Sequence, residues 1–252
     1  MRIKHTLGAI YLIAACISCS PQNTAEQQES SEEKQEIAKP KNIILLIGDG
    51  MGLSQVSSAY YFQEGKKINF ERFPVIGLIN TSSAKQKITD SAAGATAFAT
   101  GKRTYNGAIS IDVDSSNIPL IIDDMDNIGK SVGLISTSSI THATPACFYA
   151  HADSRKKEEL IASQLHHSVV DFFAGGGLNY FTHRTDSANY LDSLIANGFT
   201  MDTTALTNNL TFDGSTKYGY LLAGEGMEKA PVRGDFLAQA TANALDFLNN
   251  DE

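Results

Sequence analysis

Residues 42–50 read NIILLIGDG, a short apolar run rich in isoleucine that ends abruptly in a glycine turn. A continuous apolar run of this length is typical of a strand buried on both faces of a parallel sheet. Asp49 would then follow the carboxyl end of the strand, where open α/β sheets bind their ligands. The alternative is that this Gly-Asp-Gly turn is only a tight connection between two elements.

Similar apolar runs recur along the chain and alternate with helical patterns. We predict further strands at residues 75–80, 132–136, 169–174 and 218–222. We predict helices at residues 91–100, 120–128, 155–167, 190–196 and 235–249. Strands that alternate with helices indicate an α/β fold with a doubly wound sheet. The last predicted helix is followed by no further strand where the alternation calls for one, so we expect a sheet truncated on its C-terminal side.

The charge of the chain argues against one class of function. The 252 residues carry a formal net charge of -8 at pH 7, with no evident cluster of Lys and Arg. Nucleic-acid-binding proteins hold the phosphate backbone with clustered Lys and Arg. We therefore expect no nucleic-acid partner, and we expect any bound phosphate to be small and held locally.

The first residues are typical of a targeting signal. Arg2 and Lys4 precede an apolar stretch, residues 7–15, that is too short to span a bilayer. The stretch ends in LIAAC, which resembles a bacterial lipobox with Cys16 as the lipidated residue. Cys19 fits this pattern less well, and an ordinary signal peptide that contains cysteine is the alternative.

These features divide the chain into three parts. We assign residues 1–19 to the signal peptide and residues 20–40, which are rich in Gln, Glu, Ser and Lys, to a disordered polar tether. Residues 41–252 then form the folded domain. Cys147 is the single cysteine of that domain, and we assign it no role, because a lone cysteine is usually a small buried apolar residue.

A second motif, TDSAAGAT at residues 89–96, places Ser91 at the start of a helix made of small residues. The free backbone N–H groups and the dipole of a helix N-terminus favour an anion, either a phosphate or the alkoxide of Ser91. The alternative is that Asp90 or Ser91 is only an N-cap.

A third motif, THATPACFYAHADSR at residues 141–155, follows the strand predicted at residues 132–136. His142 and Thr144 should therefore lie at the same sheet edge as Asp49. Arg155 has a planar guanidinium that suits the oxygens of a phosphate. The alternatives are a capping or surface histidine and an arginine that pairs with a helix or solvent.

Together the three motifs resemble the alkaline phosphatase family over residues 42–249. The segments GKRTYNG at residues 101–107 and AGGGLNYF at residues 174–181 also look like family segments. Sulfatases, phosphoglycerate mutases and nucleotide pyrophosphatases share the fold, but DSAAG and HATP resemble alkaline phosphatases proper. The resemblance implies a three-layer αβα sheet, of which this chain would be the N-terminal part.

The resemblance also implies roles for individual residues. Asp49 would bridge a zinc and a magnesium site, and Ser91 would be the nucleophile that is phosphorylated while bound to zinc. Asp90 would hold Arg155, which would bind the non-bridging oxygens of the phosphate.

His142 and Thr144 would help to form the magnesium site, where some bacterial relatives carry aspartate instead of histidine. The intact family member binds two Zn²⁺ and one Mg²⁺, and we expect the remaining ligands to come after residue 252. The implied function is hydrolysis of phosphate monoesters through a phosphoserine. The alternatives are a truncated, non-catalytic lipoprotein that binds phosphate, or a phosphodiesterase or sulfatase of the same superfamily.

The family resemblance and the targeting signal also predict partners and a location. The partners would be small phosphate esters and inorganic phosphate, a membrane reached through a lipid anchor, and a second copy in a homodimer. The protein would be extracytoplasmic, in the periplasm or cell envelope.

Overall fold

The computed structural model describes residues 40–249, apart from residues 66, 209 and 212. The predicted signal peptide with Cys16 and Cys19, and all of the predicted tether except residue 40, lie outside the described residues. Within the described part of the chain, no helix has the length and apolarity needed to cross a membrane.

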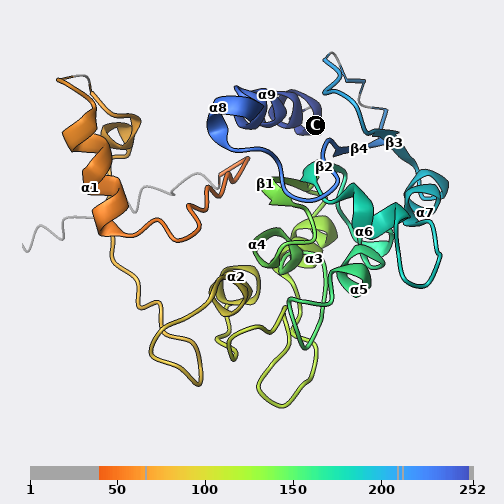
Figure 1. Ribbon diagram of the computed structural model, residues 1–252, viewed down its shortest axis with the longest axis horizontal. Coiled ribbons are helices and arrows are strands. Elements are labelled where there is room, and N and C mark those ends of the chain that lie inside the picture. Colours follow the sequence, from red (N-terminus) through yellow and green to blue (C-terminus); the bar gives the residue numbers. More distant parts are fainter. Residues whose placement is uncertain (1–39, 66, 209, 212, 250–252) are drawn as a thin grey trace, which may run out of the picture. The chain divides into compact units, whose positions relative to one another are not determined.

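Four parallel strands form one sheet (Figure 1). They are β1 (Gly133–Ser139), β2 (Phe172–Gly176), β3 (Phe199–Asp202) and β4 (Lys217–Leu221), hydrogen-bonded in the order β1-β2-β4-β3. The strands predicted at residues 132–136, 169–174 and 218–222 are confirmed as β1, β2 and β4. The sequence did not reveal β3, because four residues are too few to show a clear period.

Most of the predicted helices are confirmed. The matching elements are α2 (Ser91–Thr100), α3 (Ile121–Asn127), α7 (Tyr190–Ala196) and α9 (Phe236–Leu248). The remaining helices are α1 (Leu53–Phe62), η1 (Asn69–Arg72), α4 (Ala143–Ala146), α6 (Leu178–Thr182) and α8 (Ala230–Arg233).

The helix predicted at residues 155–167 is wrong in its extent. It is replaced by the short helix α5 (Glu158–Ala162) and a 3-10 turn, η2 (Leu165–His167). Lys157, the N-cap of α5, has φ −87° and ψ 52°, which is outside the helical conformation. The chain therefore enters the helix only at Glu158.

The strands predicted at residues 42–47 and 75–80 are also wrong. The structure describes both segments as extended chain outside any sheet, and Ile44, Leu46 and Ile76 are 57%, 71% and 92% exposed. An apolar run becomes a buried strand only when neighbouring strands bond its backbone and layers cover its faces. Within the described residues, no strand pairs with either segment.

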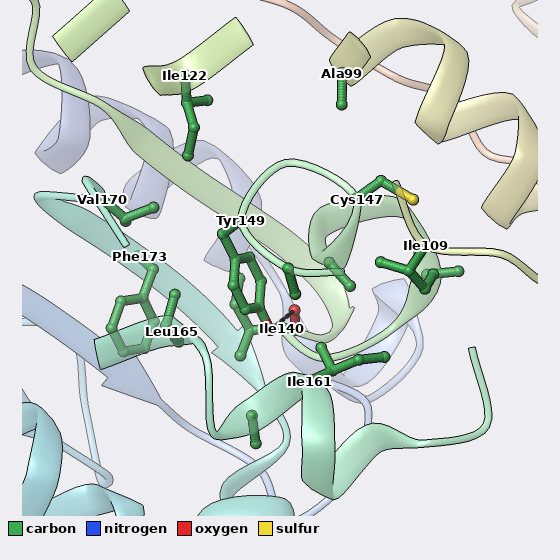
Figure 2. Packing of buried hydrophobic residues seen from close by; sticks show 14 of the residues in the cluster. Ala99, Ile109, Ile122, Ile140, Cys147, Tyr149, Ile161, Leu165, Val170 and Phe173 are labelled. Carbon is green, nitrogen blue, oxygen red and sulfur yellow. Dashed lines mark hydrogen bonds between the residues drawn. The ribbon is translucent and has the colours of Figure 1, made fainter. Parts of the chain in front are cut away.

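Helices cover both faces of the sheet, which confirms the three-layer αβα arrangement. Side chains alternate across a strand, so Phe172 and Phe173 of β2 face opposite sides. Phe173 belongs to the larger apolar cluster, part of which Figure 2 shows around Tyr149 and Leu165. Phe172 packs with Phe247 of α9, with ring centroids 6.3 Å apart. The sheet is thus buried on both faces. The loops that connect its strands can form a site at its edge.

Candidate active site

Ser91 is the first residue of α2, a ten-residue helix that begins at an acidic cap. Asp90 is the N-cap, and its Oδ1 accepts a hydrogen bond from the Ala93 N–H at 3.0 Å. The small buried residues of the helix allow it to pack closely against α4. Ser91 itself is half-buried. It lies at the helix end where the backbone N–H groups have no carbonyl partner within the helix. The N-cap interpretation of Asp90 is therefore correct, and it leaves the second carboxylate oxygen available.

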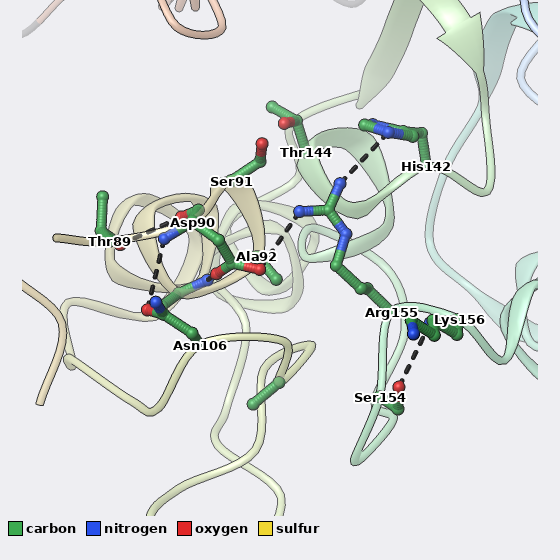
Figure 3. Close-up of polar contacts among 12 residues, drawn as sticks. Thr89, Asp90, Ser91, Ala92, Asn106, His142, Thr144, Ser154, Arg155 and Lys156 are labelled. Atoms are coloured by element: carbon green, nitrogen blue, oxygen red, sulfur yellow. Dashed lines mark hydrogen bonds and ion pairs between the residues drawn. The ribbon is translucent and has the colours of Figure 1, made fainter. Parts of the chain in front are cut away.

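That second oxygen holds Arg155. Arg155 Nη1 lies 3.1 Å from Asp90 Oδ2, and both side chains are about one quarter exposed, at 25% and 27%. Arg155 Nη2 lies 3.1 Å from Nε2 of His142 (Figure 3). Because a guanidinium can only donate, Nε2 of His142 is the acceptor in this contact. One arginine thus connects α2 with the loop after β1.

Asp49 brings the first motif to the same place. Its Oδ1 accepts a hydrogen bond from Ser91 Oγ at 3.1 Å, and its Oδ2 accepts one from Thr144 Oγ1 at 3.0 Å. Asp49 is exposed, and the turn that carries it has Gly50 at φ +65°, a conformation that favours glycine. All six residues singled out from the sequence therefore meet in two contact groups, one around Asp49 and one around Arg155, joined by the adjacent Asp90 and Ser91.

Glu158, which sequence reasoning missed, holds the loop that carries His142. Glu158 Oε2 accepts hydrogen bonds from Thr141 Oγ1 at 2.6 Å and from Ser139 Oγ at 3.1 Å. Glu158 is the first residue of α5, three positions after Arg155. It thus ties the end of β1 to the helix that follows Arg155, and nothing in the local sequence distinguishes it from a solvated helix-start glutamate.

Asn106 is a second residue that sequence reasoning missed. Its side-chain Oδ1 accepts from the Asp90 N–H at 3.2 Å, and its Nδ2 donates to the carbonyl of Ile88 at 3.0 Å. The signal that could have found it is the segment GKRTYNG, which contains it.

The donor set at Asp49 suits a hard cation in part. One carboxylate with a hydroxyl on either side offers the oxygen ligands that magnesium prefers. The imidazole of His142, whose Nε2 contacts Arg155 in this structure, is a borderline ligand nearby. Among residues 40–249 as far as they are described, no group of three or more His, Cys, Asp or Glu side chains comes together to hold a metal. Asp49, Ser91, His142 and Thr144 therefore fit a share of a metal shell.

Cys147 lies beneath the site but is not part of its chemistry. Its thiol is buried and donates to the carbonyl of Ala92 in α2, 3.3 Å away. Burial raises the pKa of Cys147 from 9.0 to about 11, so the thiolate is disfavoured.

Comparison with known proteins agrees with this arrangement. The family model for alkaline phosphatase matches residues 40–230. Alkaline phosphatase 4 of Bacillus subtilis is 32% identical over 247 residues, which cover 90% of this chain and 52% of the relative. The chain thus spans only part of the length of the curated relatives it matches, 40% of alkaline phosphatase 3 and 52% of alkaline phosphatase 4 of Bacillus subtilis.

Solved structures give the same result. Alkaline phosphatase from the Antarctic bacterium TAB5 superposes with a TM-score of 0.81 and 50% identity, over 84% of this chain and 62% of that one. A mutant of the TAB5 enzyme, with a histidine replaced by aspartate and Mg bound in its M3 site, matches with the same TM-score and identity. The family model covers the three motifs, and the chain belongs to the alkaline phosphatase family.

Proposed function

We propose that this chain provides the nucleophile and the phosphate-binding arginine of an alkaline phosphatase, which hydrolyses phosphate monoesters through a phosphoserine. The observation that carries the proposal is that two neighbouring residues, Asp90 and Ser91, each contact a different part of the site. Ser91 Oγ bonds to Asp49, and Asp90 bonds to Arg155. This pairing puts a nucleophile and a cation that suits phosphate oxygens at one helix N-terminus.

The reaction has two steps. In the first, Ser91 Oγ forms a bond to phosphorus, the bond from phosphorus to the ester oxygen breaks, and the serine proton ends on the departing alcohol. Asp49 Oδ1 already accepts a hydrogen bond from that proton. In the second, water attacks phosphorus, the bond to Ser91 breaks, and one water proton returns to the serine as phosphate leaves. Arg155 and the N–H groups at the start of α2 hold the non-bridging oxygens throughout.

We propose metal cofactors for this reaction, with Asp49, Ser91, His142 and Thr144 as their ligands from this chain. Bound cations would lower the pKa of the serine hydroxyl and stabilise charge on the departing oxygen. The magnesium in the M3 site of the TAB5 mutant supports Mg²⁺ for the third site. Zinc at the other two sites follows from the resemblance alone.

The proposal is tested by hydrolysis of a chromogenic phosphate monoester with and without added zinc and magnesium. Turnover that requires metal and disappears in Ser91→Ala, together with a phosphoserine at Ser91 detected by mass spectrometry, would support it. Phosphate binding without turnover would point to the non-catalytic alternative. Faster hydrolysis of a phosphodiester or a sulfate ester would point to another activity of the superfamily.

We further propose an extracytoplasmic protein that is anchored by lipid at Cys16 and forms a homodimer. The support for the anchor and the location is the charge and apolar pattern of residues 1–19, which lie outside the described residues, and the dimer rests on the family resemblance alone. Cys16→Ser should move the protein from the membrane fraction to the soluble extracytoplasmic fraction, whereas Cys19→Ser should not. The dimer is tested by sedimentation of the detergent-extracted protein.

A further inference from the structure

The turn at residues 105–108 lies between the two partners of the Asp90–Arg155 ion pair. On one side, the Asn106 amide binds two backbone groups at the start of α2. Its Oδ1 accepts from the Asp90 N–H at 3.2 Å, and its Nδ2 donates to the Ile88 carbonyl at 3.0 Å. The Asn106 side chain therefore connects the Ile88 carbonyl to the Asp90 N–H. It thereby fixes the backbone that leads into α2.

On the other side, the next residue of the same turn holds Arg155. The Gly107 carbonyl accepts a hydrogen bond from the Arg155 N–H at 2.7 Å. Gly107 has φ +91°, in the left-handed region that favours glycine, so the turn is shaped to present this carbonyl. Two consecutive residues of one turn thus bind the backbones of Asp90 and Arg155.

The side chains close this arrangement into a ring. Arg155 Nη1 donates to Asp90 Oδ2 at 3.1 Å, so Asp90, Asn106, Gly107 and Arg155 are linked in a cycle. Both charged side chains are about one quarter exposed, at 25% and 27%. The ion pair is thus part-buried and holds the guanidinium at Asp90. The backbone bonds to the turn set the positions of the two residues that form this pair.

We infer that Asn106 is a positioning residue for phosphate binding, which acts through Asp90 and sets the place of the Arg155 guanidinium relative to Ser91. The inference rests on the proposed function only where it predicts a change in the affinity for phosphate. Its structural part, that Asn106 holds the Arg155 side chain, stands independently. The half-buried amide of Asn106 touches no reacting group, so it acts only through the residues it aligns.

The first test is the NMR signal of the Arg155 Nε–H in the full chain, assigned through Arg155→Lys. In Asn106→Ala we expect this signal to shift and broaden, because the guanidinium loses its fixed partner. Asn243→Ala is the matched control, since it also removes a side-chain bond to a backbone carbonyl, that of Thr207 at 2.9 Å, on α9. An unchanged Arg155 signal in Asn106→Ala would overturn the inference, whatever the activity of the protein.

The second test is the affinity of the full chain, with zinc and magnesium added, for inorganic phosphate, measured by titration calorimetry. We expect Asn106→Ala to weaken binding about tenfold, the size of one charge-assisted hydrogen bond, and Asn243→Ala to leave it unchanged. In the Arg155→Ala background, Asn106→Ala should cause no further loss, because it acts through Arg155. An equal loss in both backgrounds would mean a general structural effect and would contradict the inference.

Two further outcomes keep the tests decisive. If Arg155→Ala itself leaves phosphate affinity unchanged, the proposed function fails at Arg155, and the NMR signal alone decides the role of Asn106. If Asn106→Ala does not fold, Asn106→Asp replaces it. The aspartate keeps an acceptor for the Asp90 N–H but cannot donate to the Ile88 carbonyl, so the Arg155 signal and phosphate affinity should still change, whereas wild-type values for both would refute the role.

Discussion

Arg155 and Asp90 are 65 positions apart in the chain, yet Arg155 Nη1 lies 3.1 Å from Asp90 Oδ2 while Asp90 Oδ1 caps the helix that begins at Ser91. One carboxylate thus both caps α2 and holds the guanidinium. Because the two oxygens have separate tasks, substitutions can separate the stability of the helix from the binding of phosphate.

Asp90→Asn should keep the helix and loosen the arginine. The amide oxygen still accepts from the Ala93 N–H, but the charge that pairs with Arg155 is gone, so phosphate affinity should fall with little change in stability. Asp90→Ala should in addition lose about 1 kcal/mol of unfolding free energy, because the cap is removed. Urea denaturation of both variants, with phosphate titrations, checks this. Equal stability of the two variants would contradict the capping role.

Arg155→Lys should weaken phosphate binding by on the order of tenfold, because an ammonium cannot bind two oxygens in a planar fork. The inhibition constant of inorganic phosphate in the hydrolysis assay measures the effect. Arg103→Lys is the control, since Arg103 makes its 2.9 Å bond to the Ser82 hydroxyl outside the site. A similar loss in both variants would show that the effect is not specific to Arg155.

Thr96→Val should lower the free energy of unfolding, because it removes hydrogen bonds that anchor α2. Thr96 is fully buried, and its hydroxyl donates to the Ala108 carbonyl at 3.2 Å and accepts from the Ser110 N–H at 2.9 Å. Valine fills the same space but leaves two buried backbone groups unpaired, which costs about 1–3 kcal/mol of unfolding free energy.

Thr100→Val is the matched control for that variant. The Thr100 hydroxyl donates to the Thr96 carbonyl one turn back and is only half-buried, so its loss should change stability by less than about 0.5 kcal/mol. Denaturant melts of the two variants decide the point. A control as destabilised as Thr96→Val would show that loss of the buried bonds is not the cause.

Cys147 should make the protein less stable in strong alkali. Burial raises the pKa of its thiol from 9.0 to about 11, so between these values the folded state keeps a proton that the unfolded state has lost. The stabilising contribution is complete below about pH 9 and disappears as pH rises through about 11. The slope is on the order of 1 kcal/mol per pH unit.

The comparison that checks this is thermal unfolding of wild type and Cys147→Ala at several pH values. The variant has a lower baseline because alanine leaves a small cavity, but its stability should fall less steeply above about pH 9. Parallel pH profiles for the two proteins would contradict the assignment.

Much of the site could be predicted from local patterns. The small residues and acidic cap of residues 90–100 specify a helix with Ser91 at its start, and the apolar runs of β1, β2 and β4 specify strands. These features depend on contacts between neighbours in the chain, so the sequence carries them directly. The motifs also predict that His142 and Thr144 lie at the same sheet edge as Asp49.

Other features depend on groups that are distant in the chain. Residues 42–47 have the composition of a buried strand but lie outside the described sheet, because strand formation needs a neighbour to bond its backbone. The AGGG segment shows a similar dependence, since a Cβ on Gly176 would lie 1.9 Å from the Glu225 carbonyl oxygen. That close approach was not visible in the sequence.

The sequence by itself determined that the chain is an α/β protein with a serine at a helix N-terminus, because periodicity and capping are local properties. Only the tertiary structure showed that α5 begins at Glu158 and decided which residues hold the guanidinium. Hydrogen bonds between segments far apart in the chain form only when packing brings the segments together, and no local pattern encodes that meeting.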